Sequence, residues 1–459
     1  MPSAASTASR HDMGSAFIAA PRWRRSSRSS APLICRFRVP TKPARSSDRG
    51  GFAKSRNKIM AQVNLLSSRS SHLNSEGVYP AGWRIVSAKN CDVVLEREGR
   101  ERRFVDLTSS YGAVNFGHRN PQIDPFLDAP ADLTTGCYPR EADDLSSWLC
   151  ERLRLPFHRV LFQVGGSFAV TSALAIAQRQ RPGKIVAIAG AFHGLGLDSL
   201  AATTAQRDWA LQDSRLAKHL RTEVVHIHEG DPEPDWNKAS CFLFEPVQGA
   251  NGYIPLDLEW IGNLVDSARS HGVTIIADEI QAGFFRHGHL SPTRSAGIDS
   301  DIHLFSKSMT NGQSPLSAVV YDERFDEAVR LDSALAHTFQ TSVYGYRAGS
   351  AVALYLDANP PFASVNAIQA RLECMAIELR TVVGVEQVHV TGPSLSFGLG
   401  RPSIARAAIL ECFERGIMIL GGGAGGERIR VAPPLTIDAA ALDESAEIVL
   451  DVLARLPLQ

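Results

Sequence analysis

Short apolar segments that alternate with helical patterns constrain the fold of this chain more than any other feature. The segments occupy residues 160–162, 185–188, 241–244, 273–277 and 302–305, with helical patterns near 145–149, 169–177 and 257–270. A strand that is apolar at successive positions must be buried on both faces. A mostly parallel sheet covered by helices on both sides provides that burial. The pattern therefore predicts an α/β fold with a mostly parallel central sheet.

The two ends of this α/β region have other patterns. Apolar stretches at residues 93–95 and 104–107 flank a charged turn at 97–100, which predicts a β-hairpin. Beyond about residue 345 the helical patterns become longer and the strand patterns weaker. The chain has 459 residues, enough for two to four domains, so we expect a second, smaller lobe at its C-terminal end.

The first 59 residues differ in composition from all that follow. They contain ten Arg and three Lys but only two acidic residues, a net charge of +11 that the other 400 residues balance. An Arg- and Ser-rich segment without an apolar period predicts disorder. Three interpretations stay open: an organelle transit peptide, a nucleic-acid tail, or an upstream extension before a true start at Met60. We favour the last, because organised patterning begins only after Met60.

Composition excludes several classes of protein. The formal net charge of +0 argues against a nucleic-acid or membrane-surface partner. No apolar run approaches the roughly 18 residues of a membrane helix. The seven cysteines show no C-x-x-C pair and no metal-ligand spacing, which indicates reduced thiols and no metal centre. We therefore expect a soluble, cytoplasmic protein.

Two charged residues follow buried segments of the predicted sheet. Lys307 comes after the segment 302–305, and Asp278 comes after 273–277. Burial lowers the pKa of a lysine and makes its amine a Schiff-base nucleophile. An aspartate at a strand end can hold a buried positive charge, such as a protonated pyridine nitrogen. Taken singly, a surface lysine and a helix cap explain these two residues better, so only their combination with other motifs carries weight.

Two further strand ends carry residues suited to a flat, phosphorylated ligand. Gly165, Gly166 and Ser167 join a predicted strand to a helix, whose first N–H groups attract a phosphate. Phe192 and His193 follow the segment 185–188, and an aromatic ring there can stack on a heteroaromatic ring. A plain tight turn and ordinary core packing are the alternative explanations.

Together with their neighbours, these motifs resemble the class III aminotransferases, a family of fold-type-I pyridoxal-phosphate enzymes. The resemblance extends from about residue 106 to 435. The segments that carry it are 116–121 (Phe-Gly-His-Arg-Asn-Pro), 191–194 (Ala-Phe-His-Gly), 245–249 (Glu-Pro-Val-Gln-Gly), 278–284 (Asp-Glu-Ile-Gln-Ala-Gly-Phe) and 306–308 (Ser-Lys-Ser). Their combination in this order is highly specific.

The resemblance implies how the ring of pyridoxal 5'-phosphate is held. Lys307 would carry the cofactor as a Schiff base and then act as general base and acid. Asp278 would keep the pyridine nitrogen protonated, which makes the ring an electron sink. Gln281 would lie near the phenolic oxygen, and Phe192 would stack on the ring with His193 beside it.

The resemblance also implies the residues around the phosphate and the substrate. Gly166 and Ser167 would hold the phosphate, and Glu245 belongs to the cofactor-binding set. Thr338 would reach the phosphate across a dimer interface, with Thr341 as the weaker candidate for that role. Arg430 would bind a substrate carboxylate through two hydrogen bonds.

The family fold implies a domain organisation for the whole chain. A large cofactor-binding domain would occupy residues 107–343. A smaller α+β domain would be built from both chain ends, 60–106 and 344–459, with 1–59 as the disordered arm. The family also implies a homodimer.

Three departures from the family pattern concern the substrate more than the cofactor. Phe168 stands where the family has an acidic residue after the phosphate-loop serine. Phe285 takes the position of the second glycine in Gly-Phe-Gly-Arg, and 341–343 (Thr-Ser-Val) replaces Gly-Asn-Pro. Phosphate binding through backbone donors tolerates the first change.

The leading hypothesis is an aminotransferase that moves an amino group from an amino acid or amine to a 2-oxo acid or aldehyde. An isomerase, racemase or decarboxylase on the same fold is the main alternative, because fold does not fix the reaction. An inactive binding protein is a second alternative. The intact set of Lys307, Asp278, Gln281 and Arg430 argues strongly against it.

Overall fold

The structure is a computed structural model that describes residues 78–124, 131–133, 136–206, 220, 222–330 and 335–457. The arm expected over residues 1–59 lies outside this part of the chain. None of the helices in these ranges has the length and apolar character needed to cross a membrane.

A seven-stranded sheet contains the predicted apolar segments. In spatial order its strands are β4 (His158–Gln163), β12 (Ser317–Asp322), β11 (Ile302–Phe305), β10 (Thr274–Asp278), β7 (Ala239–Phe244), β5 (Lys184–Ile188) and β6 (Val224–Ile227). Neighbouring strands from β11 to β6 pair in parallel, whereas β12 is antiparallel to both β11 and β4. The sheet is mostly parallel, which confirms the α/β prediction.

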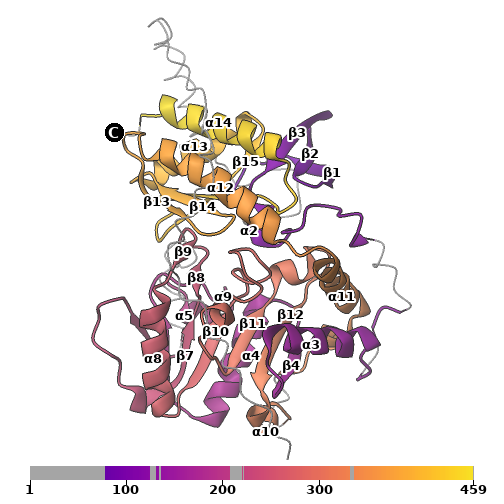
Figure 1. Cartoon of the computed structure of the whole chain (residues 1–459), viewed down its shortest axis with the longest axis vertical. Coiled ribbons are helices and arrows are strands. Elements are labelled where there is room, and N and C mark those ends of the chain that lie inside the picture. Colours follow the sequence, from indigo (N-terminus) through magenta and orange to yellow (C-terminus); the bar gives the residue numbers. More distant parts are fainter. Residues whose placement is uncertain are drawn as a thin grey trace, which may run out of the picture. The chain divides into compact units, whose positions relative to one another are not determined.

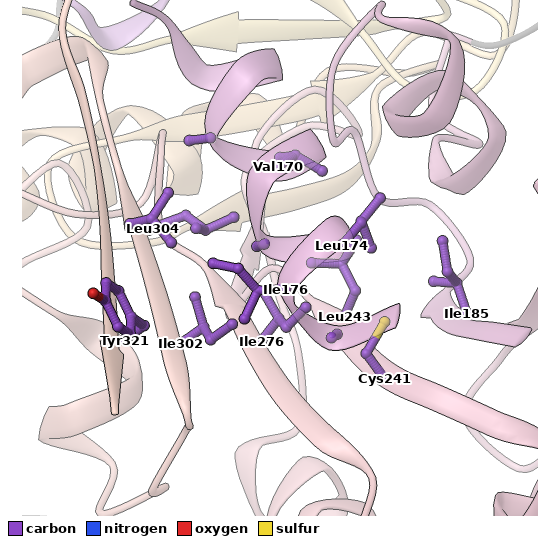
Figure 2. Close-up of a cluster of buried hydrophobic side chains, with 14 of the residues drawn as sticks. Val170, Leu174, Ile176, Ile185, Cys241, Leu243, Ile276, Ile302, Leu304 and Tyr321 are labelled. Carbon is purple, nitrogen blue, oxygen red and sulfur yellow. The ribbon is translucent and has the colours of Figure 1, made fainter. Parts of the chain in front are cut away.

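Helices cover both faces of this sheet. Successive residues of a strand point to opposite sides, so each strand contributes side chains to the packing on both faces. On β7, Leu243 belongs to a buried cluster with helix α4 (Gly166–Gln180). Phe242 belongs to a cluster on the other face with helix α8 (Leu258–Ser270). Figure 2 shows the first cluster, in which Leu174 of α4 lies against side chains of the strands. Burial on both faces of the sheet explains why these strands are apolar at successive positions.

The helix predicted over 257–270 is confirmed as α8, and its start has a local cause. Asp257 caps it: Oδ1 accepts hydrogen bonds from the backbone N–H groups of Glu259 and Trp260 at 2.9 and 3.2 Å. Such caps satisfy donors that have no partner within the helix. The remaining short and peripheral helices of this region are α2 (Ser109–Gly112), α3 (Arg140–Leu153), α5 (Leu197–Ala202), η2 (Trp236–Lys238), α9 (Pro292–Ser295), η3 (Lys307–Thr310), η4 (Glu323–Phe325), α10 (Asp326–Arg330) and η6 (Thr338–Thr341).

The predicted N-terminal hairpin is confirmed and joins a sheet with the C-terminal region. Its strands β2 (Asp92–Arg97) and β3 (Arg100–Asp106) turn at Glu98 and Gly99, which have φ of 55° and 77°. β1 (Arg84–Lys89) pairs with β2, and β15 (Ile417–Met418) pairs in parallel with β3. Segments far apart in the sequence therefore share one sheet.

A second four-stranded sheet belongs to the C-terminal region alone. Its antiparallel strands, in spatial order, are β13 (Glu386–Val390), β14 (Leu395–Gly398), β17 (Arg428–Val431) and β16 (Leu420–Gly422). The C-terminal helices are α11 (Val343–Ala358), α12 (Phe362–Leu379), α13 (Pro402–Glu414) and α14 (Ala439–Arg455). Figure 1 shows the last three together beside this sheet. The expected boundary at 343/344 falls in the first turn of α11, and the domain boundaries stay predictions.

Candidate functional site

The predicted site residues follow the carboxyl ends of parallel strands in the seven-stranded sheet. Glu245 follows β7, Asp278 ends β10, and Lys307 comes two residues after β11. His193 lies in the loop after β5. Parallel strands bring their carboxyl ends to one edge, where open α/β sheets bind ligands. The strand pattern thus accounts for the meeting of residues that are far apart in the sequence.

Asp278 and His193 form a buried pair. Oδ2 of Asp278 lies 2.8 Å from Nδ1 of His193, and Oδ1 accepts the backbone N–H of Ile280 at 3.1 Å. The backbone N–H of His193 donates to Oγ1 of Thr203 at 2.9 Å, which fixes the loop. The carboxylate is therefore held in one orientation and keeps lone pairs for a further donor.

Glu245 is also buried and Lys307 is half-buried, and each affects the protonation of the other. Burial lowers the pKa of Lys307 to about 8, although the charges of Glu245 and Asp278 act to raise it. Burial and the neighbouring Asp278 raise the pKa of Glu245 well above its usual range. Backbone N–H groups of Phe192 and Gly249 donate to the Glu245 carboxylate at 3.2 and 3.0 Å. A lysine in this setting supplies a neutral amine near neutral pH.

One end of the site is therefore acidic. Ligand atoms of His193, Glu245 and Asp278 lie within 4.8 Å of one another, a spacing that a metal ion would also fit. The adjacent Lys307 brings a competing amine to the same place. An aromatic cation such as a protonated pyridine suits this combination of acids and amine.

A glycine-rich turn at the start of α4 provides the second element of the site. Gly166 and Ser167 form the first turn of this helix, whose leading N–H groups have no partner within the helix. A Cβ on Gly166 would lie 3.1 Å from Cγ2 of Ile280, and a Cβ on Gly194 would overlap Oγ of Ser167. The packing is tight at Gly166, and at Gly194 both the close contact and a φ of 122° favour glycine. The exposed N–H groups and the helix dipole suit a phosphate.

Gln281 is held at the site by a left-handed turn that the sequence did not reveal. Its Nε2 donates to the carbonyl of Tyr111 at 2.8 Å. Ser109, Ser110 and Tyr111 all have φ between 45° and 61°, an unusual run for residues other than glycine. Because side chains with positive φ are strained, such runs tend to mark functional sites. The sequence contains no glycine at these positions that could have signalled the turn.

A positive φ also occurs at Phe285, one of the departures from the family pattern. Phe285 stands at a position where the family has glycine, and its φ is 65°. Its ring contacts the ring of Phe362 edge-on, with centroids 5.4 Å apart. The backbone therefore keeps the conformation that glycine favours, and the added ring packs on the start of α12.

Arg430 forms the basic end of the site. It lies on β17 and is almost fully buried, with only 4% of its surface exposed. Nε donates to the carbonyl of Gly421 at 2.8 Å and Nη1 to that of Gly249 at 3.0 Å. Its charge also helps to lower the pKa of Lys307, which places it near the amine. Within the described ranges Arg430 has no carboxylate partner, so a ligand carboxylate can neutralise it.

The two threonine candidates differ in exposure. Thr338 is exposed at the start of η6, whereas Thr341 is buried and its hydroxyl has no partner among the described residues. The ring of His337, next to Thr338, contacts that of Phe168 with centroids 4.8 Å apart. The structure thus places η6 beside the first turn of α4, but Thr338 does not join the buried set of site residues.

Comparison with known proteins agrees with this geometry. The family model for class III aminotransferases matches residues 75–453. A diaminobutyrate–2-oxoglutarate aminotransferase from Rhizobium meliloti is 27% identical over 430 residues, covering 82% of this chain and 90% of the relative. A 5-aminovalerate aminotransferase from Pseudomonas putida is 25% identical over 405 residues, covering 81% and 93%.

Solved structures share the fold. An ornithine aminotransferase from Toxoplasma gondii superposes with a TM-score of 0.72 at 18% identity, covering 87% of this chain and 97% of that chain. A transaminase from the marine bacterium Virgibacillus gives a TM-score of 0.71 at 20% identity, covering 87% and 98%. The fold-type-I prediction is therefore confirmed.

Proposed function

The chain belongs to the class III aminotransferases, which use pyridoxal phosphate to transfer an amino group, and we propose that Lys307 and Asp278 are its catalytic residues. One observation carries the assignment. A half-buried lysine with a pKa lowered to about 8 lies at the same sheet edge as a buried aspartate that a histidine holds in place. This arrangement matches the demands of the cofactor at both its aldehyde and its ring nitrogen.

Lys307 would attach the cofactor and move the proton. Its amine, which becomes mostly neutral above about pH 8, can act as a nucleophile and then as a base at the substrate carbon. The bound cofactor supplies an electron sink that stabilises the negative charge left on that carbon. The Asp278 carboxylate, oriented by His193 at 2.8 Å, would hold the proton on the ring nitrogen.

The remaining residues would fix the cofactor in place. Gly166 and Ser167 would bind its phosphate through the first turn of α4. Phe192 would stack on the ring, while Glu245 would remain close to Lys307 and tune its charge. Gln281, tethered to the carbonyl of Tyr111, would contact the phenolic oxygen.

Arg430 would bind a substrate carboxylate, so we propose an amino acid as donor and a 2-oxo acid as acceptor. The guanidinium is buried near Lys307 without a carboxylate partner among the described residues. Diaminobutyrate and 5-aminovalerate, named for two relatives, both carry an amino group and a carboxylate. A charge-assisted pair with two hydrogen bonds fixes the distance from the carboxylate to the reacting amine.

The donor class can be tested by the visible absorption of the purified enzyme, near 400–430 nm on the general chemistry of the cofactor. The enzyme, starting at Met60, is mixed with 2,4-diaminobutyrate, 5-aminovalerate or 1,3-diaminopropane and no acceptor. We expect the two amino acids to bleach the band and a 2-oxo acid to restore it. Equal bleaching by 1,3-diaminopropane, which lacks a carboxylate, would contradict the role of Arg430.

We further propose a homodimer in which Thr338 contributes to the phosphate site of the partner. Several large apolar side chains near η6 and the start of α4 are exposed: Tyr138, Phe168, Phe339 and Tyr344. Contact with a second copy would cover them and would bring the exposed Thr338 to a neighbouring site. Light scattering of the purified enzyme at micromolar concentration should give twice the chain mass. A cytoplasmic location stays a prediction, to be checked by cell fractionation.

A further inference from the structure

The turn of residues 249–253, between β8 (Val247–Gln248) and β9 (Ile254–Pro255), is joined to the C-terminal region by its carbonyl groups. Most of them accept a hydrogen bond from that region. The pairs are Gly249 with Nη1 of Arg430, Ala250 with the N–H of Gly423, Gly252 with Oγ of Ser396, and Tyr253 with Oγ1 of Thr391. The backbone of this turn is therefore set by the sheet that carries Arg430.

The side chain of Tyr253 is buried at the end of this turn. Only 1% of its surface is exposed, and it packs with Val247, Ala282 and Ala432. Its φ is 53°, a conformation that costs energy for a bulky side chain. The surrounding hydrogen bonds hold the strained residue in place, so its ring has one fixed position.

The ring of Tyr253 lies under the guanidinium of Arg430. The Cζ atom of Arg430 is 5.6 Å from the ring centroid, within range of a cation–π interaction. The imidazole of His287 also contacts this ring, with centroids 5.3 Å apart. Burial and the charge of Arg286 lower the pKa of His287 to about 3, so it adds no positive charge near Arg430. The guanidinium of Arg430 therefore lies against the ring of Tyr253, and the neutral imidazole of His287 contacts the same ring.

Arg428 provides an internal comparison, because it lies two residues before Arg430 on the same face of β17. Arg428 donates from Nη1 and Nη2 to Gln387 and from Nη2 to Ser396. Arg430 donates only to two backbone carbonyls, and its Nη2 has no acceptor within the described ranges. Of the two arginines, Arg430 is therefore the one that contacts the ring of Tyr253, and it is also the one that keeps donors for a ligand.

We propose that Tyr253 is a positioning residue for Arg430 and thereby sets the affinity of the enzyme for carboxylate substrates. This inference rests on the proposed role of Arg430. Carbonyl groups of Gly421 and Gly249 fix Nε and Nη1 on two sides of the guanidinium, and the ring of Tyr253 lies against the group. With the guanidinium held by these three contacts, Nη2 and the remaining proton of Nη1 are presented to a carboxylate without further ordering, which strengthens binding.

The test compares Tyr253→Leu, which removes the ring, with Tyr253→Phe, which keeps it. Tyr321→Leu on β12 is the matched control, because it removes another buried tyrosine that lies in the cluster with α4. Calorimetry measures the binding of pentanoate to the cofactor-loaded enzyme. Kinetics compare 5-aminovalerate with butylamine, the same chain without a carboxylate.

We expect Tyr253→Leu to weaken pentanoate binding about tenfold, the size of a desolvated cation–π contact. The KM for 5-aminovalerate should rise similarly, with kcat changed less than about twofold and butylamine turnover unaffected. Tyr253→Phe should recover most of the affinity, and Tyr321→Leu should show no such split. A Leu variant with normal pentanoate affinity, or a Phe variant as weak as Leu, would overturn the proposal.

Two additions keep the outcome decisive. If Tyr253→Leu does not fold, Tyr253→Met provides a flexible apolar side chain that fills the same space without a ring face. Arg430→Ala separates this inference from the proposed function. If Arg430→Ala weakens pentanoate binding and the Tyr253 variants do not, only the role of Tyr253 fails. If Arg430→Ala has no effect, or if the unaltered enzyme binds no pentanoate, the proposed role of Arg430 fails as well.

Discussion

The two ends of the site are built in different ways. The acidic end, with Asp278, Glu245 and His193, comes from the carboxyl ends of neighbouring strands of one sheet and the loops that follow them. The basic end depends on Arg430, which comes from a separate sheet and is anchored by the carbonyls of Gly421 and Gly249. Strand order alone assembles the first end, whereas the second exists only when two regions of the chain are joined.

This difference teaches where each end is vulnerable. The acidic residues are held by contacts within the loops at one sheet edge, such as the Glu245 carboxylate accepting the N–H of Gly249. The orientation of Arg430 depends on a turn whose carbonyls are bonded to distant residues. Gly249 contributes to both ends, since its N–H donates to Glu245 and its carbonyl accepts from Arg430. Substitutions can therefore disable one end, the other, or both.

The largest expected effect is at Lys307, which serves both ends. Lys307→Ala should abolish the visible absorption of the bound cofactor and lower turnover by about 10⁴-fold or more, because nucleophile and base are lost together. Absorption spectra and single-turnover kinetics measure the two effects. Lys238→Ala, an exposed lysine paired with Asp235, is the control. A Lys307 variant that keeps the band would remove this residue from the site.

Asp278→Asn tests the acidic end alone. An amide cannot hold the proton on the ring nitrogen, so proton abstraction should slow by roughly 100- to 1000-fold with the fold intact. Stopped-flow bleaching by an amino acid donor measures this step. Asp257→Asn is the matched control, since asparagine also caps a helix well and α8 lies outside the site. An unchanged bleaching rate in Asp278→Asn would show that the carboxylate has no part in the reaction.

Gly249→Ala should affect both ends at once. A Cβ there would overlap Oε1 of Gln281. Either the side chain of Gln281 leaves its place or the turn shifts, and a shift of the turn moves the anchors of Glu245 and Arg430. We expect about a tenfold to hundredfold loss in kcat/KM for an amino acid donor, the loss that a displacement near 1 Å brings.

The control for this change is Gly262→Ala in α8, where a Cβ has open space. It should leave activity unchanged and stabilise the helix slightly. Normal kinetics of Gly249→Ala would mean that the two ends are not joined through this residue.

The smallest expected effect is on the pKa of Lys307, which substitutions of Glu245 and Arg430 should shift in opposite directions. The neutral amine captures the cofactor, so the capture rate of the cofactor-free enzyme should rise with pH and level off above about pH 8. The carboxylate of Glu245 raises the pKa of Lys307, and the charge of Arg430 lowers it. Glu245→Gln should therefore move the midpoint to lower pH, and Arg430→Ala should move it to higher pH.

We expect each shift to be less than about one pH unit. Stopped-flow absorption across pH 6–10 measures the capture rate. Shifts in the same direction for both variants would contradict the division of the site into an acidic and a basic end.

Much of the acidic end could be read from the sequence. Apolar segments located the strands of the sheet, and the residues directly after them, Asp278 and Lys307, lie at its carboxyl edge as expected. The same reasoning missed β12, and apolarity alone would also not have shown that this strand runs antiparallel to its neighbours. The hairpin and α8 were also correct, because their turn and cap signals are local.

The basic end could be only partly predicted. Arg430 was identified through the family resemblance, but its anchors at Gly249 and Gly421 were not. Tyr253 was missed because a single tyrosine in a turn gives no signal of what its ring will contact. The left-handed turn at Ser109, Ser110 and Tyr111 was missed because residues other than glycine rarely adopt such conformations.

The sequence by itself determined the α/β architecture and the order in which Glu245, Asp278 and Lys307 meet along one edge. It did so because the periodicity of apolar residues and the alignment of parallel strand ends are repetitive, local properties. Tertiary structure alone decided how Arg430 is oriented and which ring supports it. The contacts of Arg430 with Gly249 and Tyr253 join residues more than a hundred positions apart, and Tyr253 has a strained backbone angle, which takes its form only when distant segments pack together.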